Sequence, residues 1–240
     1  MDTASSQALR KALDLLIDPP AEPDLSHGYL DLLGTGSDAP KNTGFIQKAW
    51  ASPLGSMLYD QAQLLNRRIV AASRPPIDWL NIPSGGTALD VGSGPGNITA
   101  ALARAAGLDG VALGVDISEP MLARAVEAEA GRQVAFLRAD AQRLPFRDES
   151  FDAVVSLAVL QLIPDPVAAL SEMARVLRPG RRMAVMVPTA GHGAALRFLS
   201  RGGARLFAED ELGDVFEDLG LVGVRTKTHG FIQWVRGAKP

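Results

Sequence analysis

The residues best suited to chemistry lie in one short run that begins at Asp90 and ends at Asn97. Within this run every second residue from Gly92 to Gly96 is glycine, which gives the pattern D-x-G-x-G-x-G. Glycine has no Cβ, so the backbone can turn tightly and approach a ligand closely. If the run joins a strand to a helix, the N–H groups of the first helical turn attract polar or anionic groups. A glycine loop alone is weak evidence of a nucleotide-binding site. The dinucleotide-binding fingerprint is G-x-G-x-x-G, and Asn97 occupies the position of its last glycine here.

Two further acids follow the glycine loop at informative distances. Asp116 stands 20 residues after Gly96, where a second strand should end, and Asp140 follows the expected third strand. An acid at the end of the second strand can accept two hydrogen bonds from a ribose diol. Because open α/β sheets bind ligands beyond the carboxyl ends of their strands, Asp90, Asp116 and Asp140 predict a nucleoside site there.

Each acid also has an ordinary structural alternative. Asp90 would accept bonds from the N–H groups of the glycine loop, which is compatible with cofactor contact. Asp116 would sit at a helix N-terminus, although Ser118 is better placed to cap that helix. Asp140 would be a solvated turn residue.

Short β-rich runs alternate with helical runs from residue 87 onward. We expect strands at 87–91, 110–116, 134–139, 151–158, 182–187, 222–228 and 231–236, and helices at 97–106, 120–130, 166–177 and 209–219. Such alternation predicts an α/β fold with a doubly wound, mostly parallel sheet of seven strands. Only His229-Gly230 separates the last two strands, so the last strand is expected to be antiparallel.

Residues 1–86 show helical pieces separated by turn-rich stretches instead of this alternation. We expect them to form an N-terminal helical extension that serves as a lid over domain 87–240. Leu9, Leu13 and Leu16 recur at helical spacing, with Ser5 or Ser6 as the cap. Residues 18–44 are rich in proline, glycine and polar residues and are expected to be a loop. Ser52-Pro53 opens a second helix. On it, Tyr59 is a candidate lid contact, with core packing as the alternative.

Composition excludes several classes of protein. The chain of 240 residues has 47% hydrophobic residues, no cysteine and a net charge of −3. It therefore forms no disulfide framework and no cysteine-ligated zinc site, and bulk electrostatics do not favour a nucleic-acid partner. The most apolar run, 153–163, is shorter than the ~20 residues that a membrane span needs. We expect a cytoplasmic protein without membrane insertion or bound metal.

The motifs together resemble those of the class I S-adenosylmethionine-dependent methyltransferases, in their small-molecule branch. Asp90 and the loop Gly92–Gly96 resemble the family's first motif, Asp116 the ribose-binding acid, and Ile117 the residue that packs on adenine. Leu144–Phe146 with Ser150–Asp152, and Arg175–Gly180, resemble the segments that lead into the fourth and fifth strands. The resemblance covers residues 87–187. It implies a Rossmann-like methyltransferase fold and S-adenosyl-L-methionine as cofactor, bound by Asp90, Gly92, Ser93, Gly94, Gly96, Asp116, Ile117, Asp140, Ala141, Ser156 and Tyr59.

The acceptor is less well marked by the sequence. Many family members carry histidine after the fourth strand, where this chain has Leu160-Gln161-Leu162, and the motif of the quinone branch is absent from that loop. This argues against quinone C-methylation but not against methyl transfer itself. O-methylation of a small-molecule hydroxyl is one expectation, while the choice among O-, N- and C-methylation stays open. His192, after the fifth strand, is a candidate general base, with a polar loop residue as the alternative. The rival functions are a non-catalytic S-adenosylmethionine-binding regulator and a nicotinamide-dependent oxidoreductase. Monomer and homodimer stay equally open.

Overall fold

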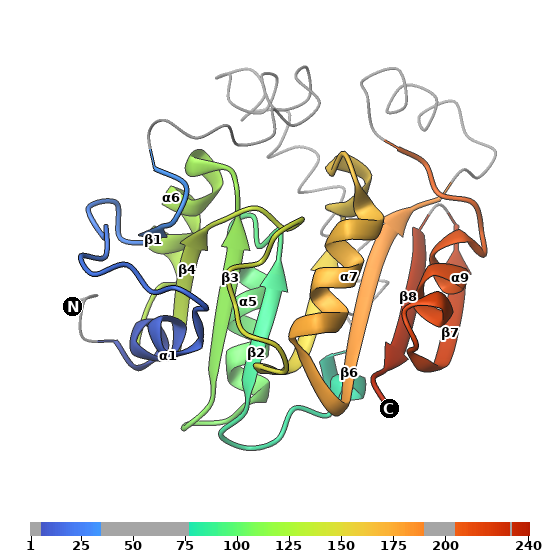
Figure 1. Ribbon diagram of the computed structural model, residues 1–240, viewed down its shortest axis with the longest axis horizontal. Coiled ribbons are helices and arrows are strands. Elements are labelled where there is room, and N and C mark those ends of the chain that lie inside the picture. The colour runs from blue at the N-terminus through green and yellow to red at the C-terminus, as the bar shows by residue number, and fades with distance from the viewer. Residues whose placement is uncertain (1–5, 35–76, 190–204, 231) are drawn as a thin grey trace.

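The computed structural model describes residues 6–34, 77–189, 205–230 and 232–240. An eight-stranded sheet with the order β1-β4-β3-β2-β5-β6-β8-β7 forms the centre of the molecule (Figure 1). Its strands are β1 (Leu30–Asp31), β2 (Thr87–Val91), β3 (Val111–Asp116), β4 (Val134–Arg138), β5 (Phe151–Leu157), β6 (Leu177–Pro188), β7 (Val222–His229) and β8 (Ile232–Ala238).

The sheet has the doubly wound topology that the sequence predicts. From β2 the chain proceeds outward through β3 to β4, then crosses back to β5 and continues to β6. Those neighbours pair in parallel, while β8 runs antiparallel to both β6 and β7. The predicted antiparallel last strand is confirmed. Between β2 and β5 the order in which the chain adds strands to the sheet reverses, and such sheets bind ligands at this point.

The strand count differs from the predicted seven because of β1. The expected loop at 18–44 contains two residues, Leu30 and Asp31, that pair in parallel with Leu137 and Arg138 of β4. Two residues are too few to show an alternating pattern in a sequence. The pairing is reinforced by an ion pair between Arg138 Nη1 and Asp31 Oδ2, at 3.0 Å.

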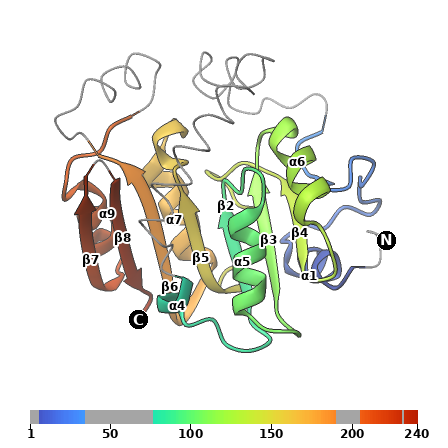
Figure 2. The same cartoon turned by 180° about the vertical axis from the view of Figure 1, so that it is seen from behind.

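Helices cover both faces of the sheet, with α1, α7 and α9 on the face seen in Figure 1 and α4, α5 and α6 on the face seen in Figure 2. Their bounds are α1 Gln7–Leu15, α4 Ile77–Leu80, α5 Asn97–Ala105, α6 Glu119–Glu129, α7 Pro166–Val176 and α9 Glu211–Asp218. The caps follow the sequence: Ser6 Oγ accepts from Leu9 N, and Asp165 accepts from Ala168 N. Such caps stabilise a helix by about 1 kcal/mol.

One helix boundary differs from the prediction. We expected Pro179-Gly180 to end the helix that precedes β6, but α7 ends at Val176 and β6 starts at Leu177. Leu177 pairs with Phe151 of β5, and the register shifts before Ala153 pairs with Arg182. Gly180, with a φ of 73°, therefore lies inside an irregular β6. Pairing with a distant strand overrides the local turn signal here.

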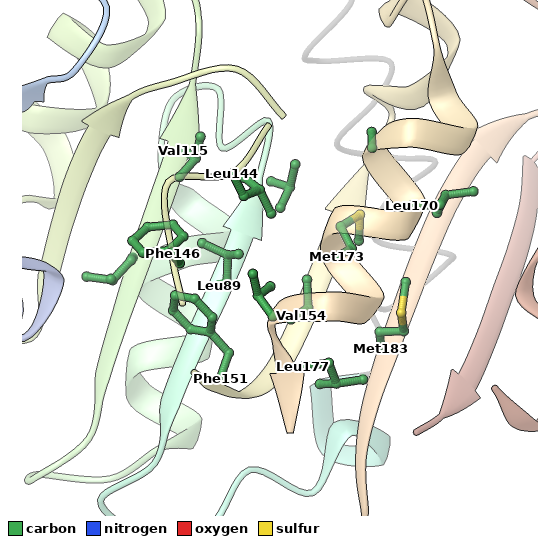
Figure 3. Close-up of a cluster of buried hydrophobic side chains, with 14 of the residues drawn as sticks. Leu89, Val115, Leu144, Phe146, Phe151, Val154, Leu170, Met173, Leu177 and Met183 are labelled. Atoms are coloured by element: carbon green, nitrogen blue, oxygen red, sulfur yellow. The ribbon is translucent and has the colours of Figure 1, made fainter. Parts of the chain in front are cut away.

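The main core lies between the sheet and α7, as Figure 3 shows. Leu89 and Val154 reach it from the sheet, and Leu170 and Met173 from α7. The rings of Phe146 and Phe151 meet edge to face, with centroids 4.9 Å apart. Burying each such side chain stabilises the fold by about 1.5–3 kcal/mol. This packing fixes the strands, and with them the residues at the strand ends.

The described part of the N-terminal extension belongs to the body of the sheet. Leu9 and Ala12 of α1 are buried in the main core cluster, and β1 forms an edge of the sheet. Residues 6–34 therefore pack with the expected domain 87–240. The lid stays a prediction for residues 35–76, which lie outside the described residues. No helix among the described segments is long and apolar enough to cross a membrane.

Arg175 fastens the segment before β5 to α7. Its guanidinium donates to the carbonyl oxygens of Leu144 (3.0 Å) and Phe146 (2.8 Å). It also pairs with Glu172 (2.7 Å) and Asp148 (2.7 Å). The other side of this segment pairs with the residues after α1, through an antiparallel bridge between Phe146 and Leu16. Arg175 thus adds a second attachment, to α7.

Replacing Arg175 by alanine is expected to lower the free energy of unfolding by about 2 kcal/mol, because two backbone carbonyls lose a charged donor. The ion pair with exposed Asp148 contributes little of this. Urea denaturation measures the loss. Arg132→Ala, at an exposed position, should change the free energy by no more than about 0.5 kcal/mol. Equal losses in the two variants would contradict this role of Arg175.

Candidate functional site

The glycine loop folds back onto the end of β3. The backbone N–H groups of Gly92 and Ser93 both donate to the carbonyl of Val115, at 2.7 and 3.0 Å. The N–H of Gly94 donates to Asp116 Oδ2 at 2.9 Å. Loop and acid are thereby fixed together at the carboxyl edge of the sheet, the upper edge in Figure 1.

Two glycines of the loop are required for different reasons. Gly92 has a φ of 77°, and a Cβ there would come within 2.2 Å of Val159 Cγ2. Gly94 has a φ of 50°, but a Cβ there would meet no protein atom within 4 Å. Gly92 therefore serves packing against the loop after β5. Gly94 leaves free space beside a backbone that already contacts Asp116.

Asp116 lies at the carboxyl end of β3 and is partly buried. Its Oδ1 accepts from Ser118 N at 2.8 Å, and its Oδ2 accepts from Gly94 N. Burial raises the pKa of the carboxyl group, against the lowering effect of these hydrogen bonds. Each carboxylate oxygen has a second lone pair, so the group can still accept two hydroxyl donors from a ligand. Ser118 is the N-cap of α6, as expected, but its side chain makes no capping hydrogen bond.

Asp90 is almost fully buried and bonds to α5. Its Oδ2 accepts from Thr99 Oγ1 at 2.7 Å. Burial raises the pKa of Asp90 to about 7. The hydrogen bond from Thr99 opposes this shift, and the negative charge of Asp116 adds to it. Asp90 thus ties the end of β2 to the first turns of α5, a partner that the sequence did not indicate. Direct contact of Asp90 with a cofactor stays a prediction.

Asp90→Asn is expected to change how stability depends on pH. The folded-state pKa lies above the ordinary value, so protonated Asp90 favours the folded state. Its stabilising contribution is complete below pH 4 and is lost as the pH rises toward about 7. The free energy of unfolding of the wild type should therefore fall relative to that of the variant between these values. Urea denaturation at several pH values measures it, and parallel profiles for the two proteins would contradict the shift.

The third acid lies beyond the end of β4. Asp140 Oδ1 accepts from Gln142 N at 2.9 Å, while Gln142 Oε1 accepts from Asp165 N at 3.0 Å. The turn role proposed as the alternative is therefore present. Asp116 is paired with Arg138 in the sheet, and Asp140 follows Arg138 by two residues. Asp140 therefore lies just beyond the level of Asp116 at the carboxyl edge of the sheet. Ile117 and Ala141, the neighbouring predicted contacts, are both partly buried.

Two buried hydroxyl groups near these strand ends lack hydrogen-bond partners among the described residues. They belong to Ser93 in the glycine loop and Ser156 in β5. Their exposed fractions are 5% and 0%. An unpaired buried hydroxyl costs free energy unless a ligand or water satisfies it. The free space at Gly94, the carboxylate of Asp116 and these hydroxyls fit a polar, nucleoside-bearing cofactor.

The loop after β5 adds residues that sequence reasoning missed. Val159 fills the space that Gly92 leaves, and Ala158 takes a φ of 58°, which is unusual for a residue with a Cβ. Gln161 Nε2 donates to the Ala158 carbonyl at 2.7 Å. Neither a valine nor an alanine signals such a position in a sequence. Tyr59 and His192 lie outside the described residues, so their predicted roles are untested. In the described segments no group of three or more His, Asp or Glu side chains could hold a metal ion.

Comparisons with known proteins agree on one family. Residues 89–185 match a family model described as a methyltransferase domain. The demethylmenaquinone methyltransferase of Bacillus licheniformis is 44% identical over 102 residues, which are 42% of this chain and 44% of that protein. That of Staphylococcus aureus is 33% identical over 177 residues, 62% of this chain and 73% of the relative. The chain thus spans less than half the length of the Bacillus relative and nearly three quarters of the Staphylococcus one.

Solved structures share the fold. A putative methyltransferase in complex with the Trm112 activator of Haloferax volcanii has a TM-score of 0.68 at 21% identity, covering 81% of this chain and 97% of that one. A possible histamine N-methyltransferase from Thermotoga maritima has a TM-score of 0.64 at 22% identity, covering 81% and 100%. At such identities the likeness concerns the fold alone.

Proposed function

This chain belongs to the class I S-adenosylmethionine-dependent methyltransferase family, and we propose that it transfers a methyl group from that cofactor to a small organic acceptor. The observation that carries the proposal is the carboxylate of Asp116 at the end of β3, fixed beside the open space at Gly94. A ribose diol fits that carboxylate, and the open space lets the rest of the cofactor approach the backbone.

The chemistry requires alignment more than acid or base groups. When bound, the cofactor would supply a methyl group activated by a positively charged sulfur: the acceptor would form its new bond to the methyl carbon, and the electrons of the broken carbon–sulfur bond would go to the sulfur. The chain has to orient the cofactor and exclude water. Asp116 would hold the ribose, and the loop bonds to Val115 and Asp116 keep the backbone in place. Asp90, Ser93, Ser156, Ile117, Asp140 and Ala141 are proposed to complete the binding site.

For the acceptor we propose a quinone-type ring that is methylated at carbon. The relatives at 33–44% identity are named demethylmenaquinone methyltransferases, which supports this acceptor class. The absence of the quinone-branch motif from the loop after β5 argues against this acceptor, and O-methylation of a hydroxyl is the alternative. O-methylation needs a base more often than methylation of an acidic carbon does. His192 is the proposed base if the product is an O-methyl compound.

Two experiments test the function in order. Calorimetric titration should show binding of S-adenosylmethionine and of its demethylated product, and weak or no binding of NAD. Incubation with labelled cofactor and a panel of demethylated quinols and catechols should then give a labelled product, and mass spectrometry with NMR should place the methyl group on carbon. Tight NAD binding without binding of the sulfonium cofactor would overturn the family function. Binding without turnover on any acceptor would favour the regulatory alternative, and an O-methyl product would overturn the proposed ring carbon.

A further inference from the structure

Positive charge is concentrated on the last three strands of the sheet. Strands β6, β7 and β8 contain no aspartate or glutamate, although the whole chain has a net charge of −3. Their basic residues are Arg178, Arg181, Arg182, Arg225, Lys227 and Arg236. Such segregation creates a local positive field on a protein that is acidic overall.

Four of these cations share one face of the sheet and have no carboxylate partner among the described residues. Arg178 and Arg181 both pair with Asp152. Arg236 stands directly opposite Arg225 on β7 and opposite Ala184 on β6. Lys227 stands opposite Trp234, and Arg182 lies two residues before Ala184 on β6. Directly opposite residues point to the same face, so Arg182, Arg225, Lys227 and Arg236 form one cationic surface, named here the basic face.

The basic face lies away from α9, on the side of the sheet seen in Figure 2. Arg225 and Lys227 are exposed. Within the described residues, none of the four cations forms an ion pair. Asp78 of the neighbouring helix α4 is exposed and does not pair with them either. The charge of the face is therefore available to a partner.

Two of the guanidinium groups are held in place by an aromatic ring. The Cζ atoms of Arg182 and Arg236 lie 5.1 and 4.8 Å from the ring centroid of Trp79. Arg182 also donates to the Trp79 carbonyl at 2.6 Å. Cation–π contacts fix the direction of an arginine without neutralising its charge. Ordering these side chains in advance lowers the entropic cost of binding an anion.

Protection of an edge strand does not fully explain this arrangement. β7 is the last strand of the sheet, and charges on an edge strand discourage unwanted pairing. That accounts for Lys227 on β7 itself. It does not account for Arg236 on the inner strand β8, directly opposite Arg225, since like charges opposite each other destabilise a sheet. An anion placed against the pair would remove the repulsion.

We propose that the basic face, together with the outer edge of β7, which pairs with no other strand among the described residues, binds a partner protein through an extended acidic segment. The segment would add as a further strand, with its backbone pairing to β7. Arg225, Lys227 and His229 recur at every second residue of β7 and so share one face. Acidic side chains at every second position of the added strand would face them. A second copy of this chain is a poor partner, because its own β7 would bring the same cations into the contact.

A pair of peptides tests the proposal on the full-length protein. Each has eight residues, the length of β7, with valine and threonine alternating either with glutamate or with glutamine. Fluorescence anisotropy should show that the glutamate peptide binds at least roughly tenfold more tightly than the glutamine peptide, and that added salt weakens its binding. Hydrogen exchange of the β7 amides should slow when the glutamate peptide is bound.

Charge-reversal variants locate the contact. Arg225→Glu with Lys227→Glu should weaken glutamate-peptide binding by at least roughly tenfold without lowering the melting temperature, because the repulsion between Arg225 and Arg236 is removed. Arg104→Glu with Arg132→Glu makes the same change in net charge at exposed positions elsewhere and should leave binding nearly unchanged. Equal losses in both double variants, equal affinity for the two peptides, or binding without slower exchange in β7 would each overturn the proposal. So would tighter binding to vesicles rich in anionic phospholipid than to the peptide.

Discussion

Replacing Asp116 by alanine is expected to weaken binding of S-adenosylmethionine by roughly a hundredfold or more. Two charge-assisted hydrogen bonds to a ribose diol, at about 1.5–3 kcal/mol each, would be lost. The loss should exceed the effect on folding, because within the described residues the substitution removes only the acceptor of the two backbone N–H groups of Gly94 and Ser118. Calorimetric titration measures the affinity, and urea denaturation measures the stability.

Two variants separate the charge of Asp116 from its shape. Asp116→Asn keeps an acceptor oxygen but removes the charge, and its affinity should fall between those of the wild type and the alanine variant. Asp24 provides a matched control, since it also accepts from the backbone N–H two residues later, at 3.0 Å from Ser26. Asp24→Ala should leave cofactor affinity unchanged. If Asp116→Ala binds the cofactor as the wild type does, Asp116 does not bind the ribose.

Alanine substitutions at Gly92 and Gly94 are expected to differ in their main effect, on folding at Gly92 and on cofactor binding at Gly94. Gly92→Ala drives a Cβ to within 2.2 Å of Val159 at a φ of 77°. Overpacking and backbone strain together should lower the free energy of unfolding by about 3 kcal/mol or more. Gly94→Ala meets no protein atom within 4 Å, so strain alone should cost about 1–2 kcal/mol. Its methyl group should instead occupy ligand space and weaken cofactor binding by roughly tenfold or more.

Gly220 is a matched control for the strain at Gly94. It has a φ of 79° and no atom within 4 Å of a built Cβ, and it follows α9, away from the glycine loop. Gly220→Ala should therefore destabilise the protein about as much as Gly94→Ala while leaving cofactor affinity intact. Thermal denaturation and calorimetric titration of the three variants decide the matter. Unchanged affinity in Gly94→Ala would mean that the ligand does not approach the loop at that residue.

Features encoded in contiguous residues could be predicted from the sequence. The strand 87–91 and the glycine loop after it occur where the sequence places them, and the positions of Asp116 and Asp140 after their strands follow from the same alternation. Periodicity reports local burial, which is why the element order and the doubly wound sheet could be read directly. The ligand edge follows from that topology, because every parallel strand ends on the same side of the sheet.

Features that depend on pairing between distant segments could not be predicted in this way. The start of β6 at Leu177 depends on its pairing with Phe151, and the pairing of β1 with β4 joins residues more than a hundred positions apart. The Asp90–Thr99 hydrogen bond depends on the direction that α5 takes after the glycine loop. The packing of Val159 beside Gly92 depends on the path of the chain after β5.

The sequence by itself thus determined the family, the order of the elements and the acids at the strand ends. The tertiary structure decided which of those acids bonds inward and which still has free lone pairs, and it brought four arginine and lysine side chains from three strands to one face. The physical reason is that alternation assigns each residue to one side of its own strand. Only the register between strands, set by packing of the whole core, decides which residues of different strands become neighbours.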